Sequence, residues 1–311
     1  KWYDAIMENL IAEENRNTGR NIRPSVGRIL TRPEDFESSH EPQTAGALRY
    51  SFIGLSSGVG TTSLTFAFAE HLIQTERAAC KQKKGSARRP RSVTVLEVGD
   101  AEAERRGYNY DRIGCDRRFA GRDFASCYAL TAAGRSIRGV SNLDSGINWL
   151  LRIPDEPQVT LDAQDYMRMI AGTPGDIVLC DFSGSFGSRL FGGGTLGRGA
   201  RAEFLHRILI DSDKVFVVID PLPSAMMADP ESLELFKTLE ASGTSVTYIV
   251  NKMNPGINRR ELKAFLRLRR PIEIPHFDPA AVYTAEYNCC TLYAMPKVSA
   301  QIKPSFEQMT L

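Results

Sequence analysis

Apolar residues along most of the chain form short continuous runs of strand length, and stretches with helical spacing separate them. Strands are predicted at residues 50–53, 92–98, 147–153, 176–181, 214–220, 245–251 and 271–275, and helices at 64–72, 119–133, 160–171, 201–209, 229–240 and 261–268. Continuously apolar strands that alternate with helices are typical of a mostly parallel sheet covered on both faces. The pattern therefore predicts an α/β fold with three layers and a doubly wound, mostly parallel sheet.

The first 48 residues follow a different pattern. Apolar positions in residues 2–14 fall on one helical face, namely Trp2, Ile6, Met7, Leu10 and Ile11. This helix either docks on the main domain or binds a partner or a second copy. Residues 15–48 are rich in Asn, Arg, Pro, Ser and Glu, which is typical of an extended linker. We therefore divide the chain into a helix and linker at 1–48 and a main domain at 49–311.

A glycine- and serine-rich turn joins the first predicted strand to its helix. Residues 54–60 read Gly-Leu-Ser-Ser-Gly-Val-Gly, and apolar residues at helical spacing follow from Leu64 to Leu72. Such a turn directs backbone N–H groups and the positive end of the helix dipole at one point, which makes an anion site most often used for phosphate. The usual phosphate-loop pattern ends in Gly-Lys-Ser/Thr. Here the run is Gly60-Thr61-Thr62, so the lysine is missing.

Ligands of parallel α/β sheets bind beyond the carboxyl ends of the strands. That rule places five segments along one rim: residues 54–62, 99–100, 181–187, 220–223 and 251–252. The glycine-rich residues 192–197 follow no strand directly, so we interpret them as a mobile loop and not as a second phosphate site.

Composition and charge narrow the function classes. The 311 residues carry a formal net charge of +2, so the field of the whole molecule predicts no polyanionic partner. Apolar runs are too short to span a bilayer, and no secretory signal pattern follows Lys1, which suggests part of a longer protein. The six cysteines are irregularly spaced, which argues against a disulfide framework or zinc site; Cys180 is expected in the core. We expect a cytoplasmic protein.

One strongly basic segment stands out, residues 77–91, which begins with Arg77 and ends with Arg91. It is either a solvated loop or a contact with nucleic acid, an anionic membrane surface or an acidic partner. Because it precedes a strand, it is expected at the sheet edge opposite the phosphate loop. A catalytic role is therefore not predicted for it.

Taken together, these segments resemble the ParA/MinD family of deviant Walker-A ATPases, over about residues 50–296. The loop 56–63 is similar to the family's Lys-Gly-Gly-Val-Gly-Lys-Thr-Thr, and residues 177–181 resemble its Walker B strand. Residues 250–252 resemble the segment that reads adenine, and residues 274–278 the segment beside the base. The resemblance implies a P-loop NTPase-like fold of the SIMIBI type.

The resemblance also implies a site for ATP or ADP with Mg²⁺. Residues matching the family's phosphate-binding positions are Ser57, Gly58, Val59, Gly60, Thr61, Thr62 and Ser63, and those matching its base-binding positions are Asn251, Lys252 and Pro275. Thr62 and Asp181 match the metal ligands. From the residues alone, the alternative interpretations are a helix cap for Thr62, a strand cap for Asp181 and a turn former for Asn251, and for Thr62 and Asp181 we favour the metal role.

Two departures from the family pattern affect catalysis. Ser56 stands in place of the signature lysine that reaches across a dimer, and Thr61 in place of the lysine on the outer phosphates. Losing both costs several kcal/mol of transition-state stabilisation, or roughly three orders of magnitude in rate. Arg189 or Arg198 is a possible substitute. In the family, an acidic residue after the second strand orients the attacking water. The candidate positions here are Glu97, Gly99 and Asp100, and Asp100 is one place out of register.

Degenerate phosphate loops are familiar in the TadZ/CpaE branch, which this loop resembles. That branch implies a homodimer that binds nucleotide with little or no hydrolysis and acts as a localisation or assembly factor. Its partners would be proteins of a pilus or secretion machine, with a place in the cytoplasm or peripherally at the inner membrane or cell pole. The alternatives are an active partitioning or positioning ATPase and a nucleotide-free scaffold. The final residues lack the basic amphipathic pattern of a MinD-type anchor.

Overall fold

The computed structural model describes residues 46–82, 89–98, 109, 112–113, 131, 134, 140–141, 146–152, 163–182, 209, 211–226, 230–241, 243–268 and 270–310. The predicted N-terminal helix, almost all of the linker and Asp100 lie outside these residues. So do nearly all of the helices predicted at 119–133 and 201–209, the loop 192–197, and both Arg189 and Arg198. The domain division at residue 48 is therefore untested.

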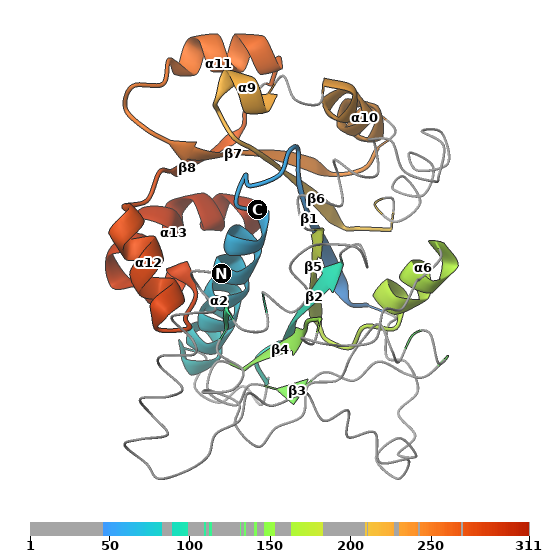
Figure 1. Ribbon diagram of the computed structural model, residues 1–311. Helices are drawn as coiled ribbons and strands as arrows, with labels where there is room; N and C mark the ends of the chain where they lie inside the picture. Colours follow the sequence, from blue (N-terminus) through green and yellow to red (C-terminus); the bar gives the residue numbers. More distant parts are fainter. Residues whose placement is uncertain are drawn as a thin grey trace, which may run out of the picture.

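An eight-stranded sheet forms the centre of the molecule (Figure 1). Its strands are β1 (Leu48–Gly54), β2 (Val93–Val98), β3 (Val140–Ser141), β4 (Ile147–Leu150), β5 (Ile177–Phe182), β6 (Lys214–Ile219), β7 (Val246–Met253) and β8 (Ile272–Pro275). The order across the sheet is β3-β4-β2-β5-β1-β6-β7-β8, and every neighbouring pair is parallel except the edge pair β3–β4. The predicted mostly parallel α/β sheet is confirmed, and among the described strands only the short β3 was not predicted.

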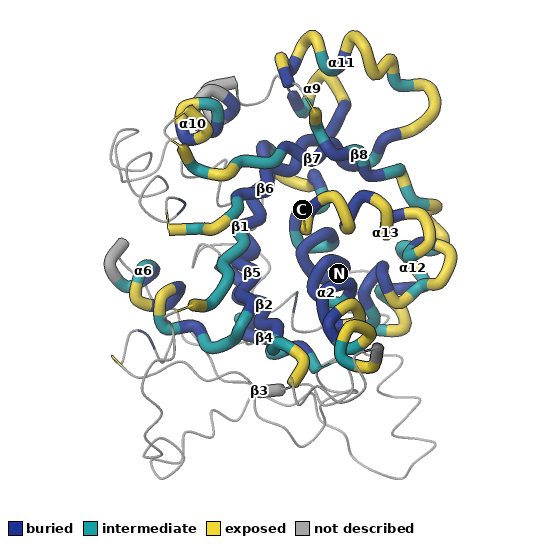
Figure 2. Tube along the Cα trace, turned by 180° about the vertical axis from the view of Figure 1, so that it is seen from behind, coloured by how far each residue is buried: buried dark blue, intermediate teal, exposed yellow. Residues whose placement is uncertain are grey.

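Helices cover both faces of this sheet (Figures 1 and 2). They are α2 (Thr61–Gln82), α6 (Ala163–Ala171), α9 (Pro223–Met226), α10 (Pro230–Ala241), α11 (Arg259–Leu266), α12 (Pro279–Tyr287), the 3₁₀ turn η2 (Leu292–Ala294) and α13 (Pro296–Thr310). One core cluster joins the sheet to α2, α12 and α13, and a second joins its other face to α6, α10 and α11. Three layers result, as the sequence predicts. No described helix is both long enough and apolar enough to cross a membrane.

Aromatic packing fixes α2 against the central strand. The ring of Phe52 in β1 lies 5.7 Å from that of Phe68 in α2 and 4.7 Å from that of Phe216 in β6. On the outer side of α2, Phe306 of α13 packs edge-on against Phe68 at 5.2 Å. These side chains are almost completely buried. The N-terminus of α2 is thereby held directly beyond the carboxyl end of β1.

The basic segment at 77–91 differs from the predicted loop. Helix α2 continues through Gln82, so the first part of the segment is helical. Near its end, Arg91 forms an ion pair with Glu76, with Nη2 and Oε1 2.5 Å apart. Leu72, Ile73 and Glu76 are buried at helical spacing. The buried face of α2 therefore continues beyond residue 72, where the predicted helix ended. Residues 83–88 lie outside the described part of the chain.

Candidate functional site

The turn between β1 and α2 has the backbone shape of a phosphate loop. Gly58 and Gly60 have φ angles of 76° and 92°, a left-handed conformation that side chains rarely adopt. A Cβ atom on Gly60 would lie 2.6 Å from the side-chain nitrogen of Asn251, so a larger residue at this position would clash with Asn251. The helix begins immediately afterwards, where the amide of Leu64 donates to the carbonyl of Gly60 at 3.0 Å.

Backbone amides converge at this turn. The amides of Thr61, Thr62 and Ser63 belong to the first turn of α2, where no intrahelical acceptor exists. No backbone amide in residues 56–63 donates to another residue in the described part of the chain. Ser57 and Gly58 are exposed, so solvent reaches the loop. The arrangement can bind an anion through N–H groups and the helix dipole.

Two side chains from the end of β7 hold the loop from the other side. Asn251 donates from Nδ2 to the carbonyl of Val59 at 2.7 Å. Lys252 donates from Nζ to the carbonyl of Gly58 at 2.8 Å and to Oδ2 of Asp220 at 2.7 Å. The predicted rim therefore does bring Asn251 and Lys252 to the phosphate loop, and it adds Asp220 as the partner of the lysine.

The backbone at Lys252 is unusual for a lysine, with φ at 57°. The pairing of β7 with β8 shifts register between Val250 and Met253, around this residue. The left-handed conformation costs on the order of 1–2 kcal/mol, which the contacts of Nζ offset. Turn formation belongs instead to Asn254, whose side chain accepts from the amide of Gly256 at 3.0 Å. The turn-former interpretation of Asn251 is thus wrong.

Asp181, near the end of β5, is completely buried, and within the described part of the chain neither carboxylate oxygen has a hydrogen-bond partner. Burial raises its pKa to about 7, and the hydroxyl of Thr62 offsets that rise in part. Glu97 lies at the matching position of the adjacent strand β2 and adds like-charge repulsion, which also raises the pKa of Asp181. An isolated buried carboxylate of this kind is costly unless a cation binds it.

Glu97 is bound differently from Asp181. Its carboxylate accepts from Nδ2 of Asn109 at 2.7 Å and from the amide of Arg152 at 2.9 Å. Burial raises its pKa, and these two donors lower it in part. The two buried carboxyl groups therefore differ: two donors lie within hydrogen-bond distance of Glu97, whereas Asp181 has hydroxyl groups such as that of Thr62 nearby but no hydrogen bond within the described residues. Asp100, the other switch candidate, lies outside the described residues.

Among the residues that the structure describes, four buried side-chain atoms without a partner lie in the loop or at the strand ends beside it. They are Oγ1 of Thr61, Oδ1 of Asn251 and both carboxylate oxygens of Asp181. Folded proteins pair nearly all of their buried polar atoms, with bound ions and ligands included in the count. The arrangement leaves a hydroxyl and three acceptor oxygens that can pair with a polar ligand or ion at this loop.

The residues present fit a hard cation only when the ligand supplies oxygen atoms. Within the described ranges, no group of three or more His, Cys, Asp or Glu residues could hold a metal ion. Mg²⁺ is commonly bound by one or two protein oxygens plus phosphate oxygens and water. Asp181 and Thr62 supply that number of protein oxygens beside the anion site, so they suit a Mg²⁺ that arrives with a phosphate group.

Positive charge reaches the loop from outside it. Besides Lys252, Arg112 donates from Nη2 to the hydroxyl of Ser63 at 2.9 Å, and its Nε lies 3.3 Å from a carboxylate oxygen of Glu286. Arg112 also lowers the pKa of Asp181. The rim predicted from the sequence included Asp220, in the segment 220–223, but not its ion pair with Lys252. Arg112 was not predicted.

Pro275 lies one strand beyond the Asn251 segment. It ends β8 and pairs with Met253, and the next amide, of His276, donates to the carbonyl of Met253 at 2.7 Å. Pro275 thus shares the rim with Asn251 and Lys252.

No protein-family model matches the sequence, and no curated protein sequence matches it either. Solved structures do resemble the fold. A chain of the MinC:MinD cell division complex of Aquifex aeolicus superposes with a TM-score of 0.58 at 15% identity, covering 85% of this chain and 96% of that one. A ParA family ATPase from Chlorobium tepidum gives 0.54 at 16% identity, covering 83% and 96%.

A putative plasmid partition protein from Borrelia burgdorferi, bound to AMPPNP, gives a TM-score of 0.52 at 15% identity, with 85% of this chain and 99% of that chain covered. Identities this low bear on the fold and not on activity. The chain has the P-loop NTPase-like fold of the ParA and MinD structures.

Proposed function

We propose that this protein binds ATP or ADP together with Mg²⁺ at the phosphate loop, and that it hydrolyses ATP slowly or not at all. The observation that carries the proposal is the set of unpaired buried atoms of Thr61, Asn251 and Asp181 around a loop of converging amides. The loop has every element of a phosphate site except the lysines.

Each part of the ligand has a matching group. The amides of residues 57–63 bind the phosphates, and Thr62 and Asp181 bind Mg²⁺. Asn251, Lys252 and Pro275 lie on the base side of the loop. Nδ2 of Asn251 already donates to the carbonyl of Val59, and its Oδ1 remains able to accept a hydrogen bond from the base. The AMPPNP-bound partition protein of the same fold supports an adenine nucleotide as the ligand.

Slow hydrolysis follows from where the positive charges lie. Phosphoryl transfer depends on neutralising charge on the transferred group. Thr61 has no charge, Lys252 is paired with the buried Asp220, and Arg112 is paired with Glu286. Asp100 stays a candidate for orienting water. Binding needs only the amides, the dipole and Mg²⁺, whereas fast turnover needs charge that this loop lacks.

We further propose a homodimer that serves as a localisation or assembly factor of the TadZ/CpaE kind. A site that binds nucleotide without hydrolysing it suits an assembly factor whose conformation depends on whether nucleotide is bound. Its partners would be proteins of a pilus or secretion machine, and its place the cytoplasm or the inner face of the membrane at a cell pole. Light scattering with and without Mg-ATP tests the dimer, and an unchanged monomer mass contradicts it.

Calorimetric titration of ATP and ADP, each with Mg²⁺ and with EDTA, tests nucleotide binding. We expect micromolar-range binding of both with Mg²⁺, since a helix N-terminus and an intact amide loop remain. Thr62→Ala should weaken binding only when Mg²⁺ is present. Thr310→Ala is the matched control, because within the described residues its hydroxyl donates only to the carbonyl of Glu307. Absence of heat and of any co-purified nucleotide would favour the scaffold alternative.

Lys252→Met is expected to weaken nucleotide binding about tenfold, because Gly58 loses the donor that fixes the loop. It should also lower the free energy of unfolding by about 1–2 kcal/mol, as Asp220 is left without its cation in a partly exposed pair. Calorimetry and urea unfolding measure the two effects.

The control for this variant is Lys303→Met, which removes an exposed lysine 3.9 Å from Glu307. It should change neither quantity. Unchanged nucleotide affinity in Lys252→Met would show that the lysine does not organise the loop.

A further inference from the structure

An arginine from a distant part of the chain lies beside the first turn of α2. Nη2 of Arg112 donates to the hydroxyl of Ser63 at 2.9 Å, and the central carbon of its guanidinium lies 5.9 Å from the centroid of the Phe66 ring. Ser63 and Phe66 are three residues apart, so they lie on one face of α2. Helix α2 therefore positions this guanidinium next to the amides that we assign to phosphate.

The backbone that carries Arg112 is fixed by its neighbours. The amide of Ile113 donates to the carbonyl of Asn109 at 3.2 Å, which closes a helical turn that includes Arg112. Nδ2 of Asn109 donates to Glu97 of β2 at 2.7 Å, and Ile113 is buried in the core that joins α2 to the sheet. The side chain of Arg112 is itself only 12% exposed. Its position beside α2 is therefore set by the fold.

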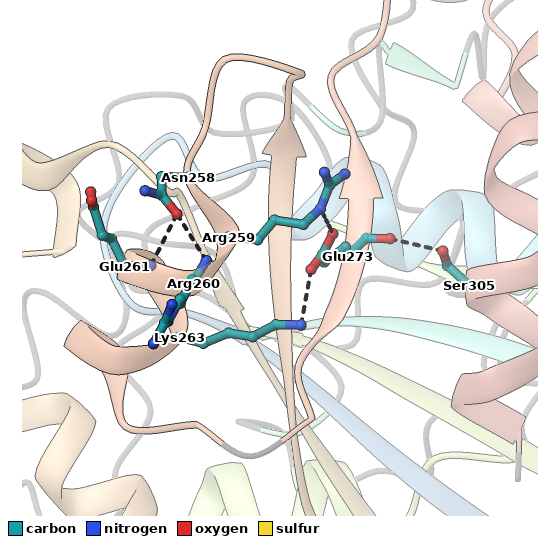
Figure 3. Close-up of polar contacts among 7 residues, drawn as sticks. All are labelled: Asn258, Arg259, Arg260, Glu261, Lys263, Glu273 and Ser305. Carbon is teal, nitrogen blue, oxygen red and sulfur yellow. Dashed lines mark hydrogen bonds and ion pairs between the residues drawn. The ribbon is translucent and has the colours of Figure 1, made fainter.

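The acidic partner of Arg112 holds it loosely. Glu286 belongs to α12, which packs beside α2 (Figures 1 and 2). Nε of Arg112 lies 3.3 Å from Oε1 of Glu286, longer than the usual N–H···O hydrogen bond, and the side chain of Glu286 is 39% exposed. Arg259 and Glu273, in contrast, approach to 2.6 Å and share a hydrogen bond (Figure 3). Partly exposed ion pairs contribute little free energy, so Arg112 can leave Glu286 at small cost.

Lys252, at the other side of the loop, is bound more firmly than Arg112. Its Nζ lies 2.7 Å from Oδ2 of Asp220, whose side chain is only 7% exposed. Departure of the lysine would leave a buried carboxylate without its cation, which is costly. Of these two cations, Arg112 is therefore the one that can change partner when an anion arrives.

We propose that Arg112 is a phosphate ligand and that Glu286 is its internal competitor. When nucleotide binds, the guanidinium exchanges the carboxylate of Glu286 for a phosphate oxygen. A guanidinium carries five N–H donors in a planar fork that matches phosphate as well as carboxylate. A phosphate held by the amides of residues 61–63 brings full negative charge to this arginine, whereas Glu286 offers a carboxylate that water already solvates. This role rests on the proposed nucleotide site.

The exchange supplies charge for binding and not for turnover. In phosphate loops the backbone amides bind the inner phosphates, and the lysine reaches the outer ones. Arg112 contacts Ser63, two residues beyond Thr61, which stands where that lysine is absent. Arg112 is therefore expected to support ATP and ADP equally and to leave hydrolysis slow.

Calorimetric titration of Mg-ADP tests the two residues in opposite directions. Arg112→Gln should weaken binding about tenfold, because a phosphate loses a charge-assisted donor, and Arg112→Lys should recover part of the loss. Glu286→Gln should instead tighten binding about two- to fivefold, since the arginine no longer leaves an acidic partner. In the Arg112→Gln background, Glu286→Gln should have no effect. Titration of Mg-ATP should give the same ratios.

The matched control is the ion pair of Arg259 and Glu273, between α11 and β8 (Figure 3). Arg259→Gln and Glu273→Gln should bind Mg-ADP as the unaltered chain does, and circular dichroism shows that each variant folds. An ion pair that is merely structural would give weaker binding in both Arg112→Gln and Glu286→Gln.

Unchanged or weaker binding by Glu286→Gln overturns the proposal, and so does unchanged affinity in a folded Arg112→Gln variant. Either result leaves the nucleotide site itself in place. Absence of Mg-ADP and Mg-ATP binding by the unaltered chain is a different outcome, which removes the nucleotide site and the role of Arg112 together.

Discussion

Asp181→Asn is expected to stabilise the nucleotide-free protein at about pH 8 by about 2 kcal/mol or more, while abolishing Mg²⁺-dependent nucleotide binding. The pKa of the buried carboxyl is raised from its ordinary value of 3.8 to about 7 by burial. Such a shift corresponds to a folding cost on the order of 4 kcal/mol above that pKa. Asparagine avoids the charge but leaves a polar group buried, so part of the cost remains.

The pH dependence has a definite sign. Because the folded pKa of Asp181 is higher than the unfolded one, its contribution to stability is most favourable below about pH 4 and is lost as the pH rises to about 7. The increase in the free energy of unfolding caused by Asp181→Asn should therefore be small near pH 4.5 and reach its full value at pH 8. Urea unfolding in EDTA at the two pH values measures it. Asp211→Asn, at an exposed position, is the control. Destabilisation by Asp181→Asn at both pH values would mean that Asp181 is a structural cap.

Introducing the family's two lysines, as Ser56→Lys with Thr61→Lys, should raise the rate of ATP hydrolysis by about two to three orders of magnitude. The amides, the helix dipole, Thr62 and Asp181 are already in place, so the missing charge is the main deficit. Phosphate release under saturating Mg-ATP measures the rate. Because Thr61 is buried with Oγ1 directed toward Gly54, the longer side chain must leave the loop on its outer side.

The control is Ser56→Gln with Thr61→Gln, which adds length without charge. It should hydrolyse ATP no faster than the unaltered chain. Equal rates in the lysine and glutamine variants would show that charge does not limit turnover, and that another element, such as the switch acid, is absent.

The sheet could be predicted from sequence because its strands are buried on both faces. All six residues of β2 and of β5 are buried, and such runs are recognisable without any partner. The rim could be predicted as well, since the carboxyl ends of parallel strands meet at one edge. That rule, together with the family resemblance, predicted that Asn251 and Lys252 lie near the loop.

Other features depend on contacts between distant segments. No helix was predicted after residue 275, where Pro279 and Pro304 interrupt the pattern; yet Pro279 follows the capping Asp278 at a position where proline is favoured. Packing of Ile302 and Phe306 in the core maintains α13 despite Pro304. The contact of Arg112 with Ser63 and that of Lys252 with Asp220 have no periodic signature. Only the folded chain reveals them.

The claim that the site holds ATP without splitting it is tested most directly by analysing the bound nucleotide. The protein is loaded with Mg-ATP, separated from free nucleotide, incubated for hours and then denatured, and the released nucleotide is identified by chromatography. We expect intact ATP in the protein fraction of the unaltered chain, and no nucleotide in that of the double variant Thr62→Ala with Asp181→Ala. Complete conversion to ADP within minutes, or no nucleotide in the protein fraction, would contradict it.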